Sequence, residues 1–171
     1  MHHLNRPDAI KHFSEIQELD QAHYPDSDEL LGIGSPFSKA FGLKRIGIHH
    51  KLLPPGRRTS WPHAEQDEEE FVYVIEGRPH VWIDGEMYQL NPGDGVGFPC
   101  ETGISHTFIN NTAEAVRLLV VGEASKKTSK IFYPLNPERK SQVKDTWWHD
   151  VPQRPLGSHD GLPDARRRSM K

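Results

Sequence analysis

The chain has 171 residues and a mass of 19.5 kDa, which is enough for one globular domain with a sizeable core and too short for two ordinary ones. Its 21 basic and 24 acidic residues give a formal net charge of −3, which argues against nucleic acid as a partner. The hydrophobic fraction of 35% includes seven Phe and four Trp, so wholesale disorder is excluded, while 14 Gly and 14 Pro indicate many turns.

No apolar run approaches the ~20 residues that cross a bilayer, and the first residues lack the apolar stretch of a signal peptide. We therefore expect a cytoplasmic protein with no membrane partner. Cys100 is the single cysteine of the sequence, which excludes an internal disulfide and a multi-thiolate zinc site within one chain. Any metal ion would have to be held by histidines and carboxylates.

Residues 1–44 are predicted to form an N-terminal arm with a short helix. Apolar residues recur there at three-residue steps, and Asp8 is placed to cap the helix that follows. The apolar positions are Ile10, Phe13, Ile16 and Leu19.

Residues 45–125 change to the two-residue alternation of β-strands. Segments rich in β-branched and aromatic residues are separated by turn signals, of which Asp84-Gly85 is the strongest. The pattern predicts roughly seven or eight short antiparallel strands, hence an all-β sandwich or closed barrel; jelly-roll barrels hold a ligand cavity between two sheets. Residues 126–171 are Pro-rich and irregular, and we expect an extension that packs on the barrel or is partly disordered.

Two histidines and two carboxylates carry the chemistry of the predicted barrel. His63 and Glu65 are two residues apart, so both side chains point to the same side of a strand. Glu70 shares its parity with the valines of the next strand and faces the interior if they do. His106 would come from a third strand. Such a set suits Fe(II), Mn(II), Zn(II), Ni(II) or Co(II) with open positions for water and substrate.

The segments containing these residues resemble the paired motifs of the cupin superfamily. The first reads Gly56-x6-His63-x-Glu65-x4-Glu70-x6-Gly77, and the second contains Pro92-Gly93-Asp94 followed by Gly103-x2-His106-x3-Asn110. The resemblance implies a double-stranded β-helix, the jelly roll of RmlC-like cupins, and is closest to single-barrel bacterial cupins without an established activity.

By this resemblance, His63, Glu70 and His106 occupy three of the four usual metal positions of a cupin. The fourth position, usually a histidine, is Glu65 here. Glu65 is therefore predicted to be either a fourth ligand to the metal or a general base over the substrate.

Three further residues are candidates for contact with a substrate. Trp61 is two residues before His63 and so points to the same side of the strand, and His50 points to the same side as the apolar Ile48. Phe108 is expected in the same cavity.

The favoured function is a metal-dependent enzyme, of the oxygenase, isomerase or lyase class, that acts on a small oxygen-rich molecule. One alternative is a non-catalytic cupin that binds or senses a small molecule or carbohydrate, and another is a metal-free, epimerase-like cupin with a histidine as base. Exposed strand edges and two aromatic-rich arms also predict a homodimer.

Overall fold

A computed structural model describes residues 6–124 and 126–169, which form ten strands and a few short helices. The strands are β1 (Ile33–Pro36), β2 (Ile46–Leu53), β3 (Ala64–Glu65), β4 (Glu70–Glu76), β5 (His80–Ile83), β6 (Glu86–Gln89), β7 (Gly95–Phe98), β8 (His106–Ile109), β9 (Val116–Glu123) and β10 (Ile131–Phe132). The α-helices are α1 (Phe37–Phe41), α2 (Arg139–Val143) and α3 (Asp164–Ser169), and the 3-10 helices are η1 (Phe13–Glu15) and η2 (Lys144–Thr146).

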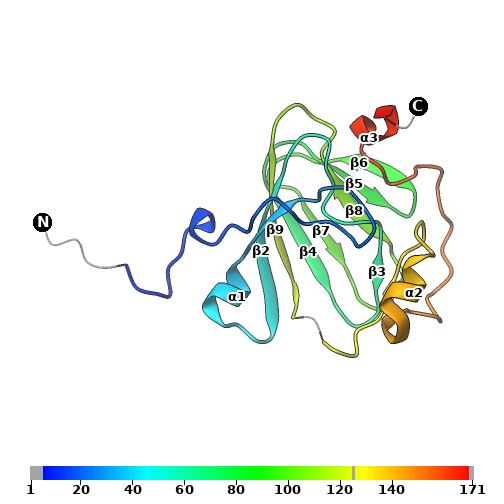
Figure 1. The fold of residues 1–171 in the computed structure, drawn as a ribbon, viewed down its shortest axis with the longest axis horizontal. Helices are drawn as coiled ribbons and strands as arrows, with labels where there is room; N and C mark the ends of the chain where they lie inside the picture. Colours follow the sequence, from blue (N-terminus) through cyan, green and yellow to red (C-terminus); the bar gives the residue numbers. More distant parts are fainter. Residues whose placement is uncertain (1–5, 125, 170–171) are drawn as a thin grey trace, which may run out of the picture.

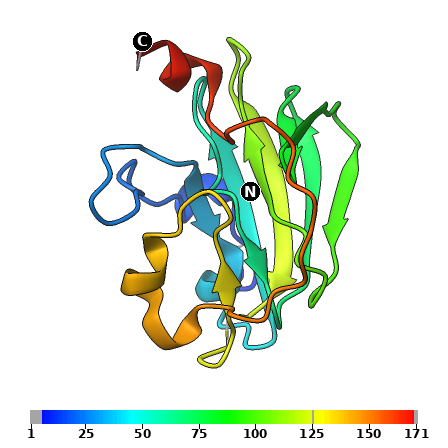
Figure 2. The same ribbon diagram turned by 90° about the vertical axis from the view of Figure 1, so that its right-hand side faces the viewer.

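The strands form two facing layers and one short pair, all with antiparallel neighbours (Figures 1 and 2). One sheet has the order β1-β2-β9-β4-β7, the second has the order β6-β5-β8, and β10 pairs with β3. Neighbouring strands in each sheet are often far apart in sequence, as in a jelly roll. The predicted all-β jelly-roll fold is confirmed.

The barrel core lies between the two sheets. In β4, Val72 and Val74 are fully buried, whereas Phe71, Tyr73 and Ile75 on the opposite face are exposed. This alternation follows from the two-residue period of a strand. The remaining core side chains come from both sheets and from the loops that close the barrel: Leu53, Val81, Leu90, Phe98, Phe108, Val116 and Leu118.

The hairpin predicted at Asp84-Gly85 is present between β5 and β6. Asp84 has φ 46° and Gly85 has φ 91°, the positive angles that a two-residue hairpin turn requires. A side chain at position 85 would also overlap the backbone of Gly157, because a Cβ there would lie 2.3 Å from the Gly157 nitrogen. The turn therefore serves as a docking point for the C-terminal extension.

The N-terminal arm differs from its prediction in two ways. The predicted helix is reduced to the single turn η1, while Ile10 and Leu19 stay exposed. The Glu18 N–H donates to the Gly34 carbonyl, so this segment hydrogen-bonds along the sheet instead of closing helical turns. In addition, β1 lies inside the predicted arm and pairs with β2, so the sheet begins at Ile33 rather than near residue 45.

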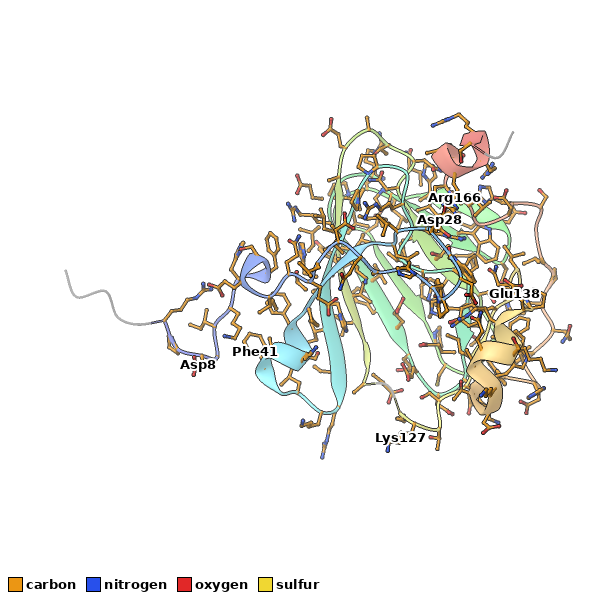
Figure 3. All side chains as sticks on the ribbon, viewed as in Figure 1. Asp8, Asp28, Phe41, Lys127, Glu138 and Arg166 are labelled. Atoms are coloured by element: carbon orange, nitrogen blue, oxygen red, sulfur yellow. The ribbon has the colours of Figure 1, made fainter. Side chains whose placement is uncertain are left out.

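The C-terminal extension packs along the barrel in the part of it that the structure describes (Figure 2). The indole N–H of Trp82, which faces away from the barrel core, donates to the His159 carbonyl at 2.8 Å. Arg166 in α3 pairs with Asp28 of the N-terminal segment at 2.7 Å, and both lie near the same end of the molecule in Figure 3. The extension thus joins the N-terminal arm to the barrel.

Across the described residues, no helix has the length and apolar character needed to cross a membrane.

Candidate functional site

His63 and His106 lie directly opposite each other in the backbone. The His63 N–H donates to the His106 carbonyl at 3.2 Å, and the His106 N–H donates to the His63 carbonyl at 2.9 Å. Residues paired in this way project their side chains from the same face. The two imidazole centroids are accordingly 5.1 Å apart.

Glu70 reaches the same point from the first position of β4. Its Oε1 lies 3.2 Å from Nε2 of His106. Phe98, the cross-strand partner of Glu70 in β7, stacks flat on the His106 ring with centroids 3.5 Å apart. The structure therefore brings His63, Glu70 and His106 together at one end of the barrel interior.

Both imidazoles have Nδ1 turned toward a backbone carbonyl. Nδ1 of His63 lies 2.9 Å from the Trp61 oxygen, and Nδ1 of His106 lies 3.4 Å from the Ile104 oxygen. With the proton on Nδ1, each Nε2 presents a lone pair, which is the arrangement of metal-bound histidines in proteins. Burial lowers the pKa of His63 to about 4, helped by the adjacent His106, so His63 is neutral at physiological pH.

The contact between His106 and Glu70 requires a positive species between the two groups or a proton on one of them. Neutral His106 with its proton on Nδ1 and ionised Glu70 would face each other with two acceptors. Burial raises the pKa of Glu70, but a hydrogen bond donated by His106 and the charge of Lys51 lower it more, so the net shift is downward. A carboxylate held in its charged form beside an imidazole nitrogen suits a divalent cation, which would take the place of the proton between the two groups.

Glu65 lies beside Glu70 without joining the imidazole pair. Both carboxyl groups line an outer cavity of about 490 Å³ together with Glu68, Glu69 and His49. Burial raises the pKa of Glu65 to about 8, and the neighbouring carboxylates of Glu68 and Glu70 add to the rise. Among the described residues, no hydrogen bond connects the Glu65 side chain to His63 or His106.

The raised pKa of Glu65 predicts a pH-dependent stability of the metal-free protein. Because the folded state binds this proton more tightly than the unfolded state, stability falls as pH rises from about 4.5 to about 8. Glu65→Gln should remove this dependence and raise the free energy of unfolding by about 2 kcal/mol at pH 9, after allowance for partial solvent access. Urea unfolding at pH 5 and pH 9 measures it; equal pH slopes in both proteins would contradict the prediction.

The three side chains are chemically suited to bind a metal, although they do not lie close enough together to form a complete coordination site. In the parts of the chain that the structure describes, no three His, Cys, Asp or Glu side chains meet closely enough to form one. His63, Glu70 and His106 nevertheless supply two nitrogen donors and one oxygen donor with both rings oriented by carbonyls. This two-histidine, one-carboxylate combination fits a divalent transition metal with open positions.

A smaller inner cavity of about 100 Å³ adjoins this group. Phe108, one of the three residues predicted to contact a substrate, lines it beside His63 and Glu70. Lys51 lines it as well, and was not predicted. Burial lowers the pKa of the Lys51 amine, while the Glu18 and Glu70 carboxylates oppose the shift. The other lining residues are Thr59, Ser60, Val72 and Val120.

His50 and Trp61, which were predicted to contact a substrate, lie outside both cavities. His50 lies on the opposite face of β2 from Lys51, where it stacks on Phe13 of the N-terminal arm with centroids 4.1 Å apart. Trp61 stacks on Tyr24 at 4.3 Å, and its indole N–H donates to Glu29. Neither lines the inner or the outer cavity. His49, one residue before His50, lines the outer cavity instead.

Comparison with known proteins identifies the family of the barrel. Residues 49–122 match the family model described as a cupin domain. The chain is 38% identical over 68 residues to "Polyketide synthase CurC" of Streptomyces cyaneus, and 36% identical over 69 residues to "Quercetin 2,3-dioxygenase" of Bacillus subtilis. Each match covers 40% of this chain, and the two cover 42% and 20% of the respective relatives.

The fold is also shared with a solved structure of a putative sugar phosphate isomerase from Acidithiobacillus ferrooxidans. The two are 27% identical, with a TM-score of 0.64 over 74% of this chain and 81% of that one. The matched domain includes most of β2, all of β4 and β8, and the three residues that converge in the barrel. On the strength of its barrel and this domain match, the chain belongs to the cupin superfamily.

Proposed function

We propose that this cupin binds a divalent metal ion through His63, Glu70 and His106 and acts as an enzyme on a small oxygen-rich molecule. The observation that supports the proposal best is the convergence of these three side chains, with each imidazole Nδ1 turned to a carbonyl. A neutral pair of imidazoles and one carboxylate leave a bound divalent ion with residual positive charge, which favours oxygen-rich ligands.

The surrounding residues would prepare a ligand for reaction. A bound metal would act there as a Lewis acid or as an oxygen-binding centre. The buried Phe98 and Phe108 rings exclude water from the imidazoles, and Phe98 also fixes the plane of the His106 ring. The names of two relatives, a dioxygenase and a putative sugar phosphate isomerase, support the oxygenase and isomerase classes.

Glu65 is proposed to transfer a proton to or from the ligand rather than to bind the metal. It lines the outer cavity next to Glu70, at the side from which a ligand would approach, and has no hydrogen bond to either imidazole. In this role Glu65→Gln would keep the metal affinity of the wild type and lose turnover. A loss of metal affinity of about 10-fold or more would instead identify Glu65 as a ligand.

Metal uptake tests the proposal. The purified protein, stripped with a chelator and dialysed, would be titrated calorimetrically with Mn²⁺, Co²⁺, Ni²⁺ and Zn²⁺, and with Fe²⁺ under anaerobic conditions. We expect one ion per chain for at least one of these metals. Binding of less than about 0.2 ions per chain under every condition would contradict a dedicated site.

A metal-free cupin is the second candidate, supported by the direct contact of 3.2 Å between Glu70 and His106. His63 would then act as the general base through Nε2, because its Nδ1 faces the Trp61 carbonyl at 2.9 Å and both nitrogens of His106 already face Glu70 and the Ile104 carbonyl. Ligand turnover by protein that takes up no metal would favour this function.

We also propose that the protein is a homodimer that associates through the outer face of β4. Phe71, Tyr73 and Ile75 are each at least 40% exposed on this face. Their neighbours across the sheet include Gly95 and Gly97, which leave the aromatic rings uncovered. A contiguous apolar face of this kind on a sheet is typical of a protein interface.

Tyr73→Glu should therefore convert the dimer to a monomer, because a carboxylate would be buried without a partner at the centre of the interface. The matched control is Tyr88→Glu, since Tyr88 is 53% exposed on β6 of the other sheet. Light scattering after size-exclusion chromatography measures the masses. A wild-type mass of 19.5 kDa at micromolar concentration would contradict the homodimer.

A further inference from the structure

Lys51 occupies an unusual place for a lysine. It lies near the end of β2 and shares the inward strand parity of Leu53, which is fully buried in the barrel core. Its side chain lines the inner cavity together with His63 and Glu70. A long cationic side chain therefore reaches the wall of the space beside the candidate metal centre.

The Lys51 amine approaches carboxylates without pairing with them. In the described residues, no ion pair within 4.0 Å includes Lys51. The carboxylates whose charges act on the Lys51 amine are those of Glu18 and Glu70. The Glu18 carboxylate and the Lys51 amine both lie next to Gly34, because this residue has no side chain between them. A Cβ at position 34 would lie 2.9 Å from the Glu18 carboxylate and 3.6 Å from the Lys51 amine.

The charge around the two cavities is mainly acidic, because six glutamates and a single lysine, Lys39, line the outer one. The outer cavity is lined by Glu18, Glu65, Glu68, Glu69, Glu70 and Glu123. Glu70 and Val120 line both cavities, so the inner one adjoins the acidic outer one. An anionic group entering here would be repelled unless a cation received it, and Lys51 is the cationic side chain that lines the inner cavity.

We propose that Lys51 binds a carboxylate of the ligand in the inner cavity, which makes the substrate of this enzyme a small hydroxy- or oxo-carboxylate. The proposal rests on the proposed function, since the hydroxyl or oxo oxygen would face the His63–Glu70–His106 centre. The remainder of the ligand, which faces the outer glutamates, is neutral or cationic for the same electrostatic reason.

The size and walls of the inner cavity support a compact anionic group. A volume of about 100 Å³ corresponds to roughly three water molecules at ~30 Å³ each, enough for a carboxylate and its neighbouring carbon. Val72, Phe108 and Val120 form apolar walls. A charge pair between such walls is stronger than one in water, and it orients the ligand for reaction.

Calorimetric binding of two small probes tests the proposal. Glycolate carries the carboxylate, and glycolamide is its neutral counterpart of similar size. Each would be titrated into wild-type protein loaded with the metal it binds most tightly, and into Lys51→Met. The matched control is Lys39→Met, because Lys39 lines only the outer of these two cavities.

We expect Lys51→Met to bind glycolate at least 10-fold more weakly and glycolamide as the wild type does, and Lys39→Met to bind both like the wild type. Metal affinity should be unchanged or higher in Lys51→Met, because a positive charge near the ion is removed. If Lys51→Met does not fold, Glu18→Gln gives an independent readout: removing the competing carboxylate should tighten glycolate binding about 3-fold or more.

The outcomes separate this inference from the proposed function. Unchanged glycolate affinity in Lys51→Met, or no glycolate binding by wild-type protein, would overturn the role of Lys51 while metal binding stands. Lys51-dependent binding of inorganic phosphate that is tighter than that of glycolate would overturn the carboxylate assignment. Failure of the wild type to take up metal would overturn the metal centre, and Lys51-dependent glycolate binding by that same metal-free protein would still support the carboxylate site.

Discussion

Replacing Glu29 with alanine is expected to lower the free energy of unfolding by about 3–5 kcal/mol, because it leaves a buried guanidinium without its counter-ion. Arg58 donates to both Glu29 oxygens at 2.7 and 2.6 Å, and the side chains are 4% and 6% exposed. Glu29 also accepts the indole N–H of Trp61 at 2.9 Å. The third Arg58 contact is the Gly161 carbonyl at 2.7 Å, so the pair connects the N-terminal arm, the barrel and the C-terminal extension.

Denaturant unfolding measures this loss, and Asp20→Ala is the matched control. Asp20 also forms a two-contact pair with an arginine, Arg57, but its side chain is 45% exposed. An exposed pair of this kind contributes about 1 kcal/mol or less. Equal losses in the two variants would show that burial of the Arg58–Glu29 pair does not determine its contribution.

Replacing His106 with alanine is expected to weaken metal binding by about 100-fold or more, equivalent to about 2.7 kcal/mol. The variant would lose one of two nitrogen donors, and Glu70 would lose the partner 3.2 Å from its carboxylate. His63→Ala should give a loss of the same order, since both imidazoles have a carbonyl partner at Nδ1.

His50→Ala is the control for these variants, because His50 is also a buried histidine and packs against Phe13 outside the barrel interior. It should retain the metal affinity of the wild type. Calorimetric titration of all three variants, with circular dichroism to verify folding, gives the comparison. Full metal affinity in both His63→Ala and His106→Ala would contradict the proposed centre.

The strand pattern predicted the fold and the inward position of Glu70 because both depend on local rules. Alternation fixes which side chains face the interior, so Glu70 could be placed from its parity with Val72. The Asp84-Gly85 turn could be predicted because few dipeptides adopt two positive φ angles. The pairing of His63 with His106 depends on a sheet contact between distant segments, which strand alternation does not predict and only the family motifs indicate.

The remaining differences arise where tertiary contacts determine which face of a segment is buried. In β2, the apolar Ile48 and Leu52 suggested that their face, with His50, is the interior one. The N-terminal arm covers that face instead, through Phe13, and the opposite face of β2 carries His49 in the outer cavity and Lys51 in the inner one. The feature of the sequence that indicates the correct face is Leu53, because this apolar residue at the end of the strand shares its face with Lys51 and is fully buried.

The most direct test of the central claim is to locate a bound metal in crystals of the loaded protein by anomalous diffraction at the absorption edge of that metal. The account predicts one strong peak in the barrel interior, with Nε2 of His63, Nε2 of His106 and a carboxylate oxygen of Glu70 at about 2.0–2.2 Å. A peak bound elsewhere on the chain, or none in crystals grown with excess metal, would contradict it.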